Sequence, residues 1–138
     1  MTGRSPDITI AGEHTAGGVA PTVASALGEI VWLFAQTPMH RHLFIADLEW
    51  MVMPPILLGQ FRLFHANERP AGLALWAYLS DEAEARLNVG VGKLKPEEWK
   101  SGPHLWLVDV IAPFGGAEEM LADLRASVFP TTPWIKGD

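Results

Sequence analysis

Apolar residues in the first part of the chain recur at a helical spacing. Beyond residue 20 they lie three and four positions apart, as on one face of an α-helix: Val23, Leu27, Ile30, Val31 and Phe34. This helix is expected to end at Thr37-Pro38, because the residue before a proline is pushed out of the helical region. Residues 1–20 are rich in Gly, Ala, Ser and Thr without any period, which predicts a flexible tail. The remaining residues, 21–138, are assigned to one domain.

A β-hairpin is predicted in the middle of the chain. Residues 56–65 and 71–79 are mostly apolar, and the polar residues 66–70 between them contain the Asn and Pro that are typical of a turn. The mixed segment before the hairpin, residues 39–53, predicts a short helix and then a loop that closes at Pro54-Pro55. The sequence therefore predicts two adjacent antiparallel strands here.

Two short helices are expected after the hairpin. Asp81 and Glu84 have the spacing of a capping box, which predicts that an acidic helix starts at Ser80-Asp81. Pro96 suits the first turn of a second helix over residues 97–100, which Gly102 then stops.

Residues 104–112 predict a central strand. Its alternation assigns Leu105, Leu107, Asp109 and Ile111 to one face and His104, Trp106, Val108 and Val110 to the other. Both faces are largely apolar, as in a strand that is covered on two sides. The turn Pro113-Phe114-Gly115-Gly116 follows, and the helical period resumes over residues 117–129. Strands and helices in this order predict an α+β fold.

Composition narrows the class of protein. A net charge of −6 disfavours nucleic acid as the main partner, because binding phosphates needs a basic face. The absence of cysteine excludes disulfides, thiolate metal sites and a cysteine nucleophile, and the histidines do not have metal-ligand spacing, so no metal is expected. No secretory signal is visible in residues 1–13, and the longest apolar segment, residues 50–58, is too short to span a bilayer. A soluble protein is expected, and the lack of cysteine suits a reducing compartment.

Two residues are candidates for catalysis. Asp109 lies in an apolar strand, where a carboxylate is costly unless it is paired. Asp109 has either a structural role, in which it caps a loop or anchors a buried arginine such as Arg62, or a functional role, in which it orients a catalytic histidine. His40, just past the Thr37-Pro38 break, is the candidate histidine; the others that remain open are His42, His65 and His104. Gly115-Gly116 before a helix suits either a bound anion or a simple tight turn.

Three groups of short motifs follow one another between about residue 27 and residue 130. The first contains Gly28-Glu29-Ile30-Val31-Trp32-Leu33 and Thr37-Pro38-Met39-His40-Arg41. The second contains Pro55-Ile56, Gln60-Phe61, Pro70-Ala71 and Trp76-Ala77-Tyr78-Leu79-Ser80. The third contains Trp99-Lys100-Ser101-Gly102, Leu105-Trp106 and Asp109-Val110-Ile111-Ala112-Pro113-Phe114-Gly115. In order and spacing these motifs resemble the RTX toxin-activating lysine acyltransferases, the haemolysin-activating type.

The resemblance implies both a fold and an activity. The fold is GNAT-like, with a mixed, mostly antiparallel central sheet flanked by helices. The activity is transfer of a fatty acyl group from the phosphopantetheine arm of acyl carrier protein to an internal lysine of a protoxin or of another exported protein or peptide. No cofactor is implied to stay bound. Two other classes remain open, namely a catalytically silent relative that binds acyl carrier protein or acyl chains, and an interaction domain.

The resemblance also implies roles for particular residues. The essential histidine of the family falls on His40 and its essential aspartate on Asp109. Thr37 stands where many members have serine and keeps a hydroxyl near the base. The donor is expected to contact Thr37 together with Trp76, Pro113, Phe114, Gly115 and Gly116.

Charge and length lead to two further expectations. Because acyl carrier proteins are acidic, docking requires a basic patch near the site, for which the candidates are Arg41, Arg62, Lys93, Lys95 and Lys100. The family usually continues beyond the position of Pro130 with further strands, whereas this sequence ends at Asp138. A shortened sheet is expected to leave an open edge, so a homodimer is predicted, with Trp134 in or beside its interface.

Overall fold

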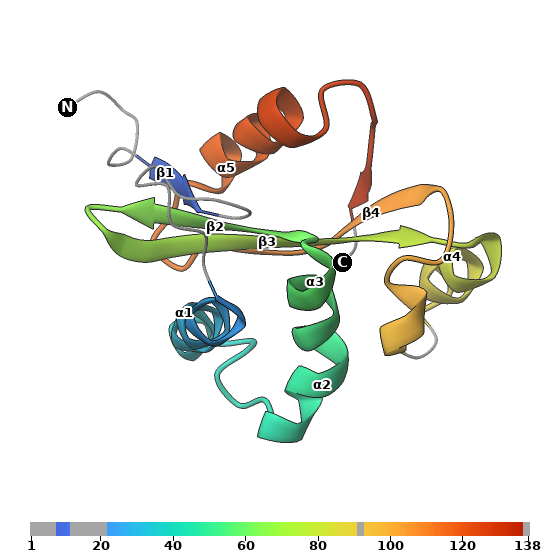
Figure 1. Ribbon diagram of the computed structural model, residues 1–138, viewed down its shortest axis with the longest axis horizontal. Helices are drawn as coiled ribbons and strands as arrows, with labels where there is room; N and C mark the ends of the chain where they lie inside the picture. The colour runs from blue at the N-terminus through green and yellow to red at the C-terminus, as the bar shows by residue number, and fades with distance from the viewer. Residues whose placement is uncertain (1–7, 12–21, 91–92, 137–138) are drawn as a thin grey trace.

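A five-stranded mixed sheet forms the centre of the computed structural model, which describes residues 8–11, 22–90 and 93–136 (Figure 1). The strands lie side by side in sequence order: β1 (Ile8–Ala11), β2 (Phe61–Ala66), β3 (Arg69–Leu79), β4 (His104–Ile111) and β5 (Ile135–Lys136). Neighbouring strands from β1 to β4 are antiparallel, and β5 is parallel to β4. The predicted α+β class with a mixed, mostly antiparallel sheet is confirmed.

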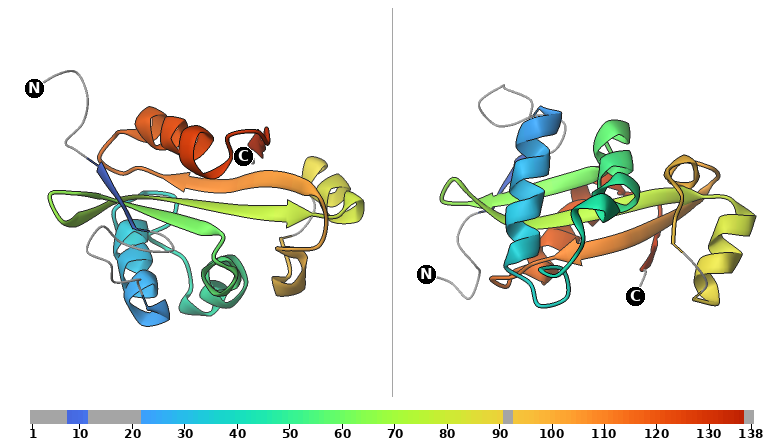
Figure 2. Two further views of the ribbon diagram at one scale, coloured as in Figure 1. Left: turned by 45° about the horizontal axis from the view of Figure 1, so that its top comes forward. Right: turned by 90° about the horizontal axis from the view of Figure 1, so that it is seen from below.

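Helices cover both faces of the sheet (Figures 1 and 2). One face carries α1 (Val23–Ala35), α2 (Leu48–Met51) and α3 (Met53–Leu58). The 3₁₀ helix η1 (Ile45–Asp47) lies between α1 and α2 in the chain. The other face carries α5 (Ala117–Asp123), which continues as one π-helical segment, η3 (Leu124–Val128). The helix α4 (Asp81–Asn88) follows β3 at the end of the sheet. No helix in the described ranges is long and apolar enough to cross a membrane.

Each face of the sheet has its own apolar core. The core on the α1 side includes Ile30, Leu33, Phe34, Leu75, Trp106 and Ile111. The core on the α5 side includes Phe64, Trp76, Leu105, Leu107, Met120 and Leu124. We call these the α1-side core and the α5-side core. Because β3 and β4 contribute to both, their two-sided apolar pattern is explained.

The helix α1 forms as its apolar spacing predicts. Thr22 caps its N-terminus, since the Thr22 hydroxyl accepts a hydrogen bond from the Ser25 amide at 2.9 Å. Its buried face contains Ala26, Ile30, Leu33 and Phe34. The helix ends two residues before Thr37-Pro38, so the predicted stop is confirmed.

The segment before the hairpin differs from its prediction. Residues 56–58, expected to begin a strand, lie in α3, and Pro54-Pro55 lie inside this helix rather than in a loop. Proline fits the first helical turn because that turn has no partner for the N–H that proline lacks. Gly59 ends the helix in the left-handed conformation at φ 71°. The strand β2 therefore starts only at Phe61.

The hairpin itself is confirmed, with a tighter turn than predicted. Ala66 pairs directly with Arg69, and only Asn67 and Glu68 connect the strands. Both have positive φ, 55° and 66°, which is the turn that matches the twist of antiparallel strands.

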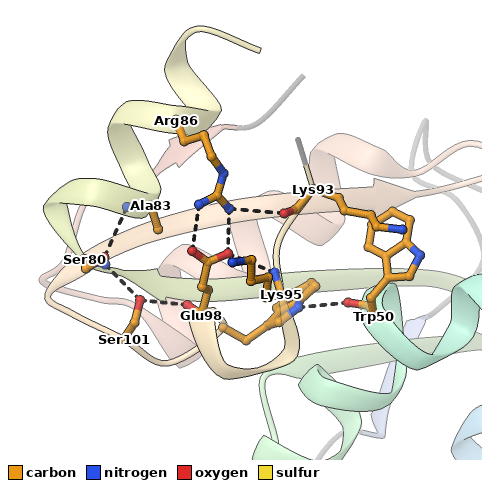
Figure 3. A network of polar contacts seen from close by, with 9 residues as sticks. Trp50, Ser80, Ala83, Arg86, Lys93, Lys95, Glu98 and Ser101 are labelled. Atoms are coloured by element: carbon orange, nitrogen blue, oxygen red, sulfur yellow. Dashed lines mark hydrogen bonds and ion pairs between the residues drawn. The ribbon is translucent and has the colours of Figure 1, made fainter. Parts of the chain in front are cut away.

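A polar network fixes the region beyond β3 (Figure 3). The helix α4 is capped by Ser80, whose hydroxyl accepts from the Ala83 amide at 3.1 Å; the predicted box of Asp81 and Glu84 is one residue out of register. The guanidinium of Arg86 donates to both carboxylate oxygens of Glu98, at 2.8 and 2.5 Å. This hydrogen bonding lowers the pKa of Glu98 from 4.5 to about 2. The second short helix is the 3₁₀ helix η2 (Pro96–Glu98).

Two predictions at the ends of the chain are revised. Within the predicted tail, Ile8–Ala11 form β1 and pair with β2, while residues 1–7 and 12–20 lie outside the described residues. Trp134 is half-buried and packs against the α5-side core of its own chain, with its ring 5.8 Å from that of Phe129. The next residues pair with β4, so the premise that this edge is fully open is wrong. The homodimer itself stays a prediction.

Candidate active site

His40 is positioned by the turn that follows α1. The Thr37 carbonyl accepts hydrogen bonds from the amides of His40 and Arg41, at 3.3 and 3.0 Å, which closes the chain into a tight turn after the helix. The turn folds the imidazole back against the helix, where it stacks on the ring of Phe34 with 4.8 Å between ring centroids and 27° between planes. Phe34 is only 4% exposed. The buried end of α1 therefore fixes the orientation of the His40 ring.

Asp109 reaches the same place through an irregularity in β4. Opposite β3, Leu75 pairs with Asp109 and Trp76 pairs with Leu107, so Val108 is an extra residue in β4. Residues that pair across an antiparallel ladder point to the same face, and Leu75 belongs to the α1-side core. The bulge therefore turns Asp109 toward α1. The prediction that Asp109 shares a face with Leu105 and Leu107 is wrong, because strict alternation breaks at Val108.

The two side chains meet in a short hydrogen bond. Nε2 of His40 lies 2.8 Å from Oδ2 of Asp109, although 69 positions separate the residues in the sequence. The His40 side chain is 14% exposed and that of Asp109 is 27% exposed. The pair is therefore partly shielded from water but open on one side. The predicted contact between His40 and Asp109 is confirmed; their catalytic role stays a prediction.

Thr37 occupies the other ring nitrogen. Its Oγ1 lies 2.9 Å from Nδ1 of His40 and 3.2 Å from the carbonyl oxygen of Phe34. It also accepts from the His40 amide at 3.2 Å. The hydroxyl is thus held by three groups of its own turn, and both nitrogens of the imidazole have partners.

These contacts define how the site handles a proton. An ionised Asp109 can only accept, so Nε2 of His40 carries its hydrogen toward the carboxylate. Nδ1 is then the basic nitrogen, and in the neutral ring it accepts from the Thr37 hydroxyl. Once Nδ1 is protonated it donates to Thr37 Oγ1, and the hydroxyl turns to the Phe34 carbonyl. The turn therefore satisfies both protonation states of His40.

The other candidate histidines lie elsewhere. His42 is exposed. His65 pairs with Glu29, with 2.7 Å between Nε2 and Oε1. His104 hydrogen-bonds to Asp81 at 2.5 Å, which raises the pKa of the His104 imidazole. Among the four histidines described, the structure thus brings only His40 to Asp109.

The basic residue suggested as an anchor for Asp109 has another partner. Nε of Arg62 lies 3.7 Å from Oδ2 of Asp123 in α5. The helix α5 covers the opposite face of the sheet from α1, the helix whose Phe34 contacts His40. Among the residues described, no group of three or more His, Cys, Asp or Glu side chains is placed to hold a metal ion. A histidine paired with a carboxylate, as His40 is with Asp109, is suited to proton transfer.

Apart from Thr37, which contacts His40, the residues expected to contact the donor lie in two other places. Trp76 is 5% exposed and lies in the α5-side core, where its ring meets that of Phe129 edge-on at 5.0 Å. Its side chain is therefore not beside His40. The turn at residues 113–116 lies past the end of β4, and Gly115 and Gly116 have φ of 91° and 89°, values that favour glycine. Phe114 in this turn is 60% exposed and lies 5.9 Å from the ring of Trp32.

Two contributions to the site were missed from the sequence. Phe34 was assigned only to the helix core, although its ring also stacks on His40. Thr37 was assigned a hydroxyl near the base, but not a hydrogen bond to Nδ1. The spacing of three residues between Thr37 and His40 is the available signal, because a turn of that length brings a side-chain oxygen back to the ring.

The geometry defines a protein with a histidine–carboxylate pair suited to general-base chemistry. Comparison with known proteins gives the family: the model of the RTX toxin acyltransferase family matches residues 20–137. The chain belongs to this family of acyltransferases.

Several curated relatives support this assignment. The lysine-acyltransferase RtxC of Vibrio cholerae is 31% identical over 113 residues, which cover 81% of this chain and 72% of the relative. The RTX-II toxin-activating lysine-acyltransferase ApxIIC of Actinobacillus pleuropneumoniae is 36% identical, covering 73% of this chain and 63% of the relative. The protein-lysine palmitoyltransferase CyaC of Bordetella bronchiseptica is 36% identical, covering 65% of this chain and 49% of the relative. The chain thus spans about half to somewhat over two thirds of the relatives it matches.

Proposed function

We propose that this chain is a lysine acyltransferase that moves a fatty acyl group from acyl carrier protein to an internal lysine of a protoxin or of another exported protein. The observation that carries the proposal is the 2.8 Å contact of His40 with Asp109, which leaves Nδ1 as a base. Membership of an acyltransferase family and the printed names of the relatives support the same chemistry.

An ammonium group cannot attack a thioester, so the lysine first releases one proton to water and reacts as the neutral amine. A base is then needed for the second proton, which the nitrogen loses as the amide forms. In our proposal Nδ1 of His40 takes a proton from the lysine as its nitrogen attacks the thioester carbonyl. The C–S bond then breaks, an amide forms, and the proton passes from His40 to the leaving thiolate. Asp109 stabilises the imidazolium that exists between these two proton transfers, as a carboxylate does in hydrolytic triads.

The Thr37 hydroxyl gives this base a defined path. Because Oγ1 lies 2.9 Å from Nδ1, the lysine proton reaches the ring either through this hydroxyl or after displacing it. In the first route Thr37 gives its proton to Nδ1 and takes one from the amine, so the hydroxyl is neither consumed nor acylated. We favour this relay, because the turn holds Oγ1 at hydrogen-bond distance from both Nδ1 and the Phe34 carbonyl.

The free part of β4 suits the arm of the donor. β5 pairs with β4 only at Trp106 and Leu107, so from Val108 onward the outer edge of β4 has no strand beside it among the described residues. Phosphopantetheine contains two amide groups, which can pair with such an edge as an added strand does. An arm that lies along residues 108–111 passes Asp109 and runs toward the turn at residues 113–116. A sheet arranged this way is consistent with the GNAT-like type that we propose for the fold.

The proposal also concerns the cellular compartment and the oligomeric state of the protein. It requires a compartment that holds acyl carrier protein, and we propose that this is the cytoplasm. We keep a homodimer as a proposal to be tested by sedimentation at micromolar concentration.

Incubation of the purified chain with palmitoyl acyl carrier protein and a lysine-containing segment of a protoxin tests the function. We expect an acyl group on one lysine, detected by mass spectrometry and stable to hydroxylamine because it is an amide. A chain that binds the carrier protein yet forms no amide under any donor chain length is a silent relative, and the proposal is then wrong.

A further inference from the structure

The loop that carries His40 has an unusual surface. Of the large apolar side chains in the described part of the protein, the three most exposed are Met39 at 85%, Ile45 at 84% and Phe44 at 78%. All three lie within five positions of His40. Neighbouring Leu43, in contrast, packs against the α1-side core and holds the loop in place. Exposed apolar side chains gathered at one site are typical of a surface that contacts a partner.

The same loop carries a cation and has no acidic residue of its own. The whole chain has a net charge of −6, but residues 30–46 contain no Asp or Glu. Arg41 and His42 lie between the apolar residues and are both exposed. The next acidic residue, Asp47, is half-buried and accepts a hydrogen bond from the Trp50 indole at 2.9 Å. The carboxylate of Asp109 faces His40 itself, at 2.8 Å from Nε2, so the exposed Arg41 is the group through which this loop attracts a negatively charged partner.

We infer that residues 39–45 form the docking surface for the acidic protein that carries the acyl thioester. The inference rests on the proposed function, because it names the surface through which the donor reaches His40. An acidic partner with apolar contact residues matches both properties of the loop, namely the cation of Arg41 and the side chains of Phe44 and Ile45. The lysine-bearing acceptor matches it less well, since its ammonium group and Arg41 repel each other.

This surface differs from the one around η2. Lys93, Lys95 and Lys100 are also exposed and are basic candidates for docking. However, the Lys93 ammonium lies 4.5 Å from the centre of the Trp50 ring, and acidic Glu97 and Glu98 lie between Lys95 and Lys100 in the sequence. A cavity of about 280 Å³ in this region is also lined by Glu49. Because this second surface carries both acidic and basic side chains, it matches an acidic partner less well than residues 39–45 do. It is therefore a suitable control.

Two donors that share one acyl chain separate docking from chemistry. One is palmitoyl acyl carrier protein, and the other is palmitoyl pantetheine, which lacks the protein. We expect the double variant Phe44→Ser, Ile45→Ser to raise KM for the carrier-bound donor about tenfold or more and to leave kcat/KM for palmitoyl pantetheine unchanged. Arg41→Glu is expected to do the same, with a smaller effect at high salt because screening weakens charge attraction. Circular dichroism and thermal unfolding verify that each variant is folded.

Matched controls on the second surface are Leu57→Ser, at a side chain that is 67% exposed, and Lys100→Glu. Both are expected to leave KM unchanged for either donor. An unchanged KM for the carrier-bound donor in the loop variants overturns the inference, and so does an equal loss with both donors. A change only in vesicle binding or in sedimentation also overturns it, since the loop then contacts lipid or a second copy.

Direct binding distinguishes this inference from the proposed function. The fluorescence anisotropy of dye-labelled palmitoyl acyl carrier protein reports docking without any transfer. One possible result is that the wild-type chain binds the carrier, that the loop variants bind it about tenfold more weakly, and that no amide forms with any of them. This result supports the docking surface and contradicts the proposed function. If the wild-type chain transfers the acyl group and the loop variants bind the carrier as well as wild type does, the docking surface alone is wrong.

Discussion

The substitution Asp109→Asn probes what the carboxylate contributes to catalysis. Asparagine has nearly the same shape, and its carbonyl oxygen still accepts a hydrogen bond from Nε2 of His40, so the change removes charge rather than contact. When His40 takes the lysine proton, the imidazolium in the native protein faces an anion 2.8 Å away; in the variant it faces a neutral amide. The transition state is therefore destabilised more than the free enzyme.

The structure sets the size of this effect. Opposite unit charges about 4 Å apart attract each other by about 4 kcal/mol at the effective dielectric constant of a protein surface. The Asp109 side chain is 27% exposed, so water screens part of this attraction, and we take about 2–3 kcal/mol. Since each 1.36 kcal/mol changes a rate tenfold, kcat is expected to fall by roughly 30- to 200-fold.

The assay is amide formation from palmitoyl pantetheine under saturating donor and acceptor. Glu29→Gln is the matched control, because Glu29 lies within α1 and forms a similar contact of 2.7 Å with a different histidine, His65. This control is expected to keep kcat within about twofold of wild type, since its charge does not face the reacting atoms. If Asp109→Asn keeps more than about a third of the wild-type kcat, or loses no more than the control, the assigned role of Asp109 is refuted.

Three further predictions concern the turn, the fold and pH. Thr37→Val is expected to lower kcat about tenfold or more, because it removes the hydroxyl that relays the proton to Nδ1. Thr37→Ser keeps a hydroxyl and is expected to retain most of the wild-type kcat. Equal activity of the two variants in the same assay contradicts the relay. Gly115 has a φ of 91°, so Gly115→Ala is expected to lower the free energy of unfolding in urea by about 1–2 kcal/mol. Gly28→Ala inside α1, where there is space for a methyl group, is expected to raise the free energy of unfolding. If both substitutions change the free energy of unfolding in the same direction, the backbone strain argued for Gly115 is contradicted. The pKa of Glu98 is lowered from 4.5 to about 2, so its pairing with Arg86 stabilises the fold above pH 4.5 and is lost as the pH falls toward 2. The difference in melting temperature between wild type and Glu98→Gln should therefore shrink from about pH 6 to about pH 3, and a constant difference contradicts this.

The spacing of apolar and polar residues correctly predicted the elements that are determined by their own sequence. The helix α1 follows from the spacing of its buried residues, and the hairpin follows from two apolar segments around a polar turn. Residues 56–58 were misassigned because an apolar run of this length suits either a strand or a helix. Pro54-Pro55 decided the outcome by starting α3, which the sequence pattern alone did not show.

The site depended on information that no local pattern holds. The proximity of His40 and Asp109 came from resemblance to a family, since nothing in the periodicity pairs positions 69 apart. The orientation of Asp109 depends on the bulge at Val108, which exists only because β4 pairs with β3 in a shifted register. Strict alternation therefore assigned Asp109 to the wrong face. Trp76 was associated with the donor through its motif, whereas its side chain packs in the α5-side core.

The most direct test of the account is the kcat of His40→Gln for palmitoyl transfer to a protoxin lysine. Glutamine keeps a polar side chain of similar length that can still hydrogen-bond to Asp109, but it cannot take a proton from the amine. With the melting temperature and donor binding close to those of wild type, kcat is expected to fall about a thousandfold, because the general base is lost. A folded His40→Gln protein that still forms the amide within about tenfold of the wild-type rate contradicts the claim that His40 is the catalytic base.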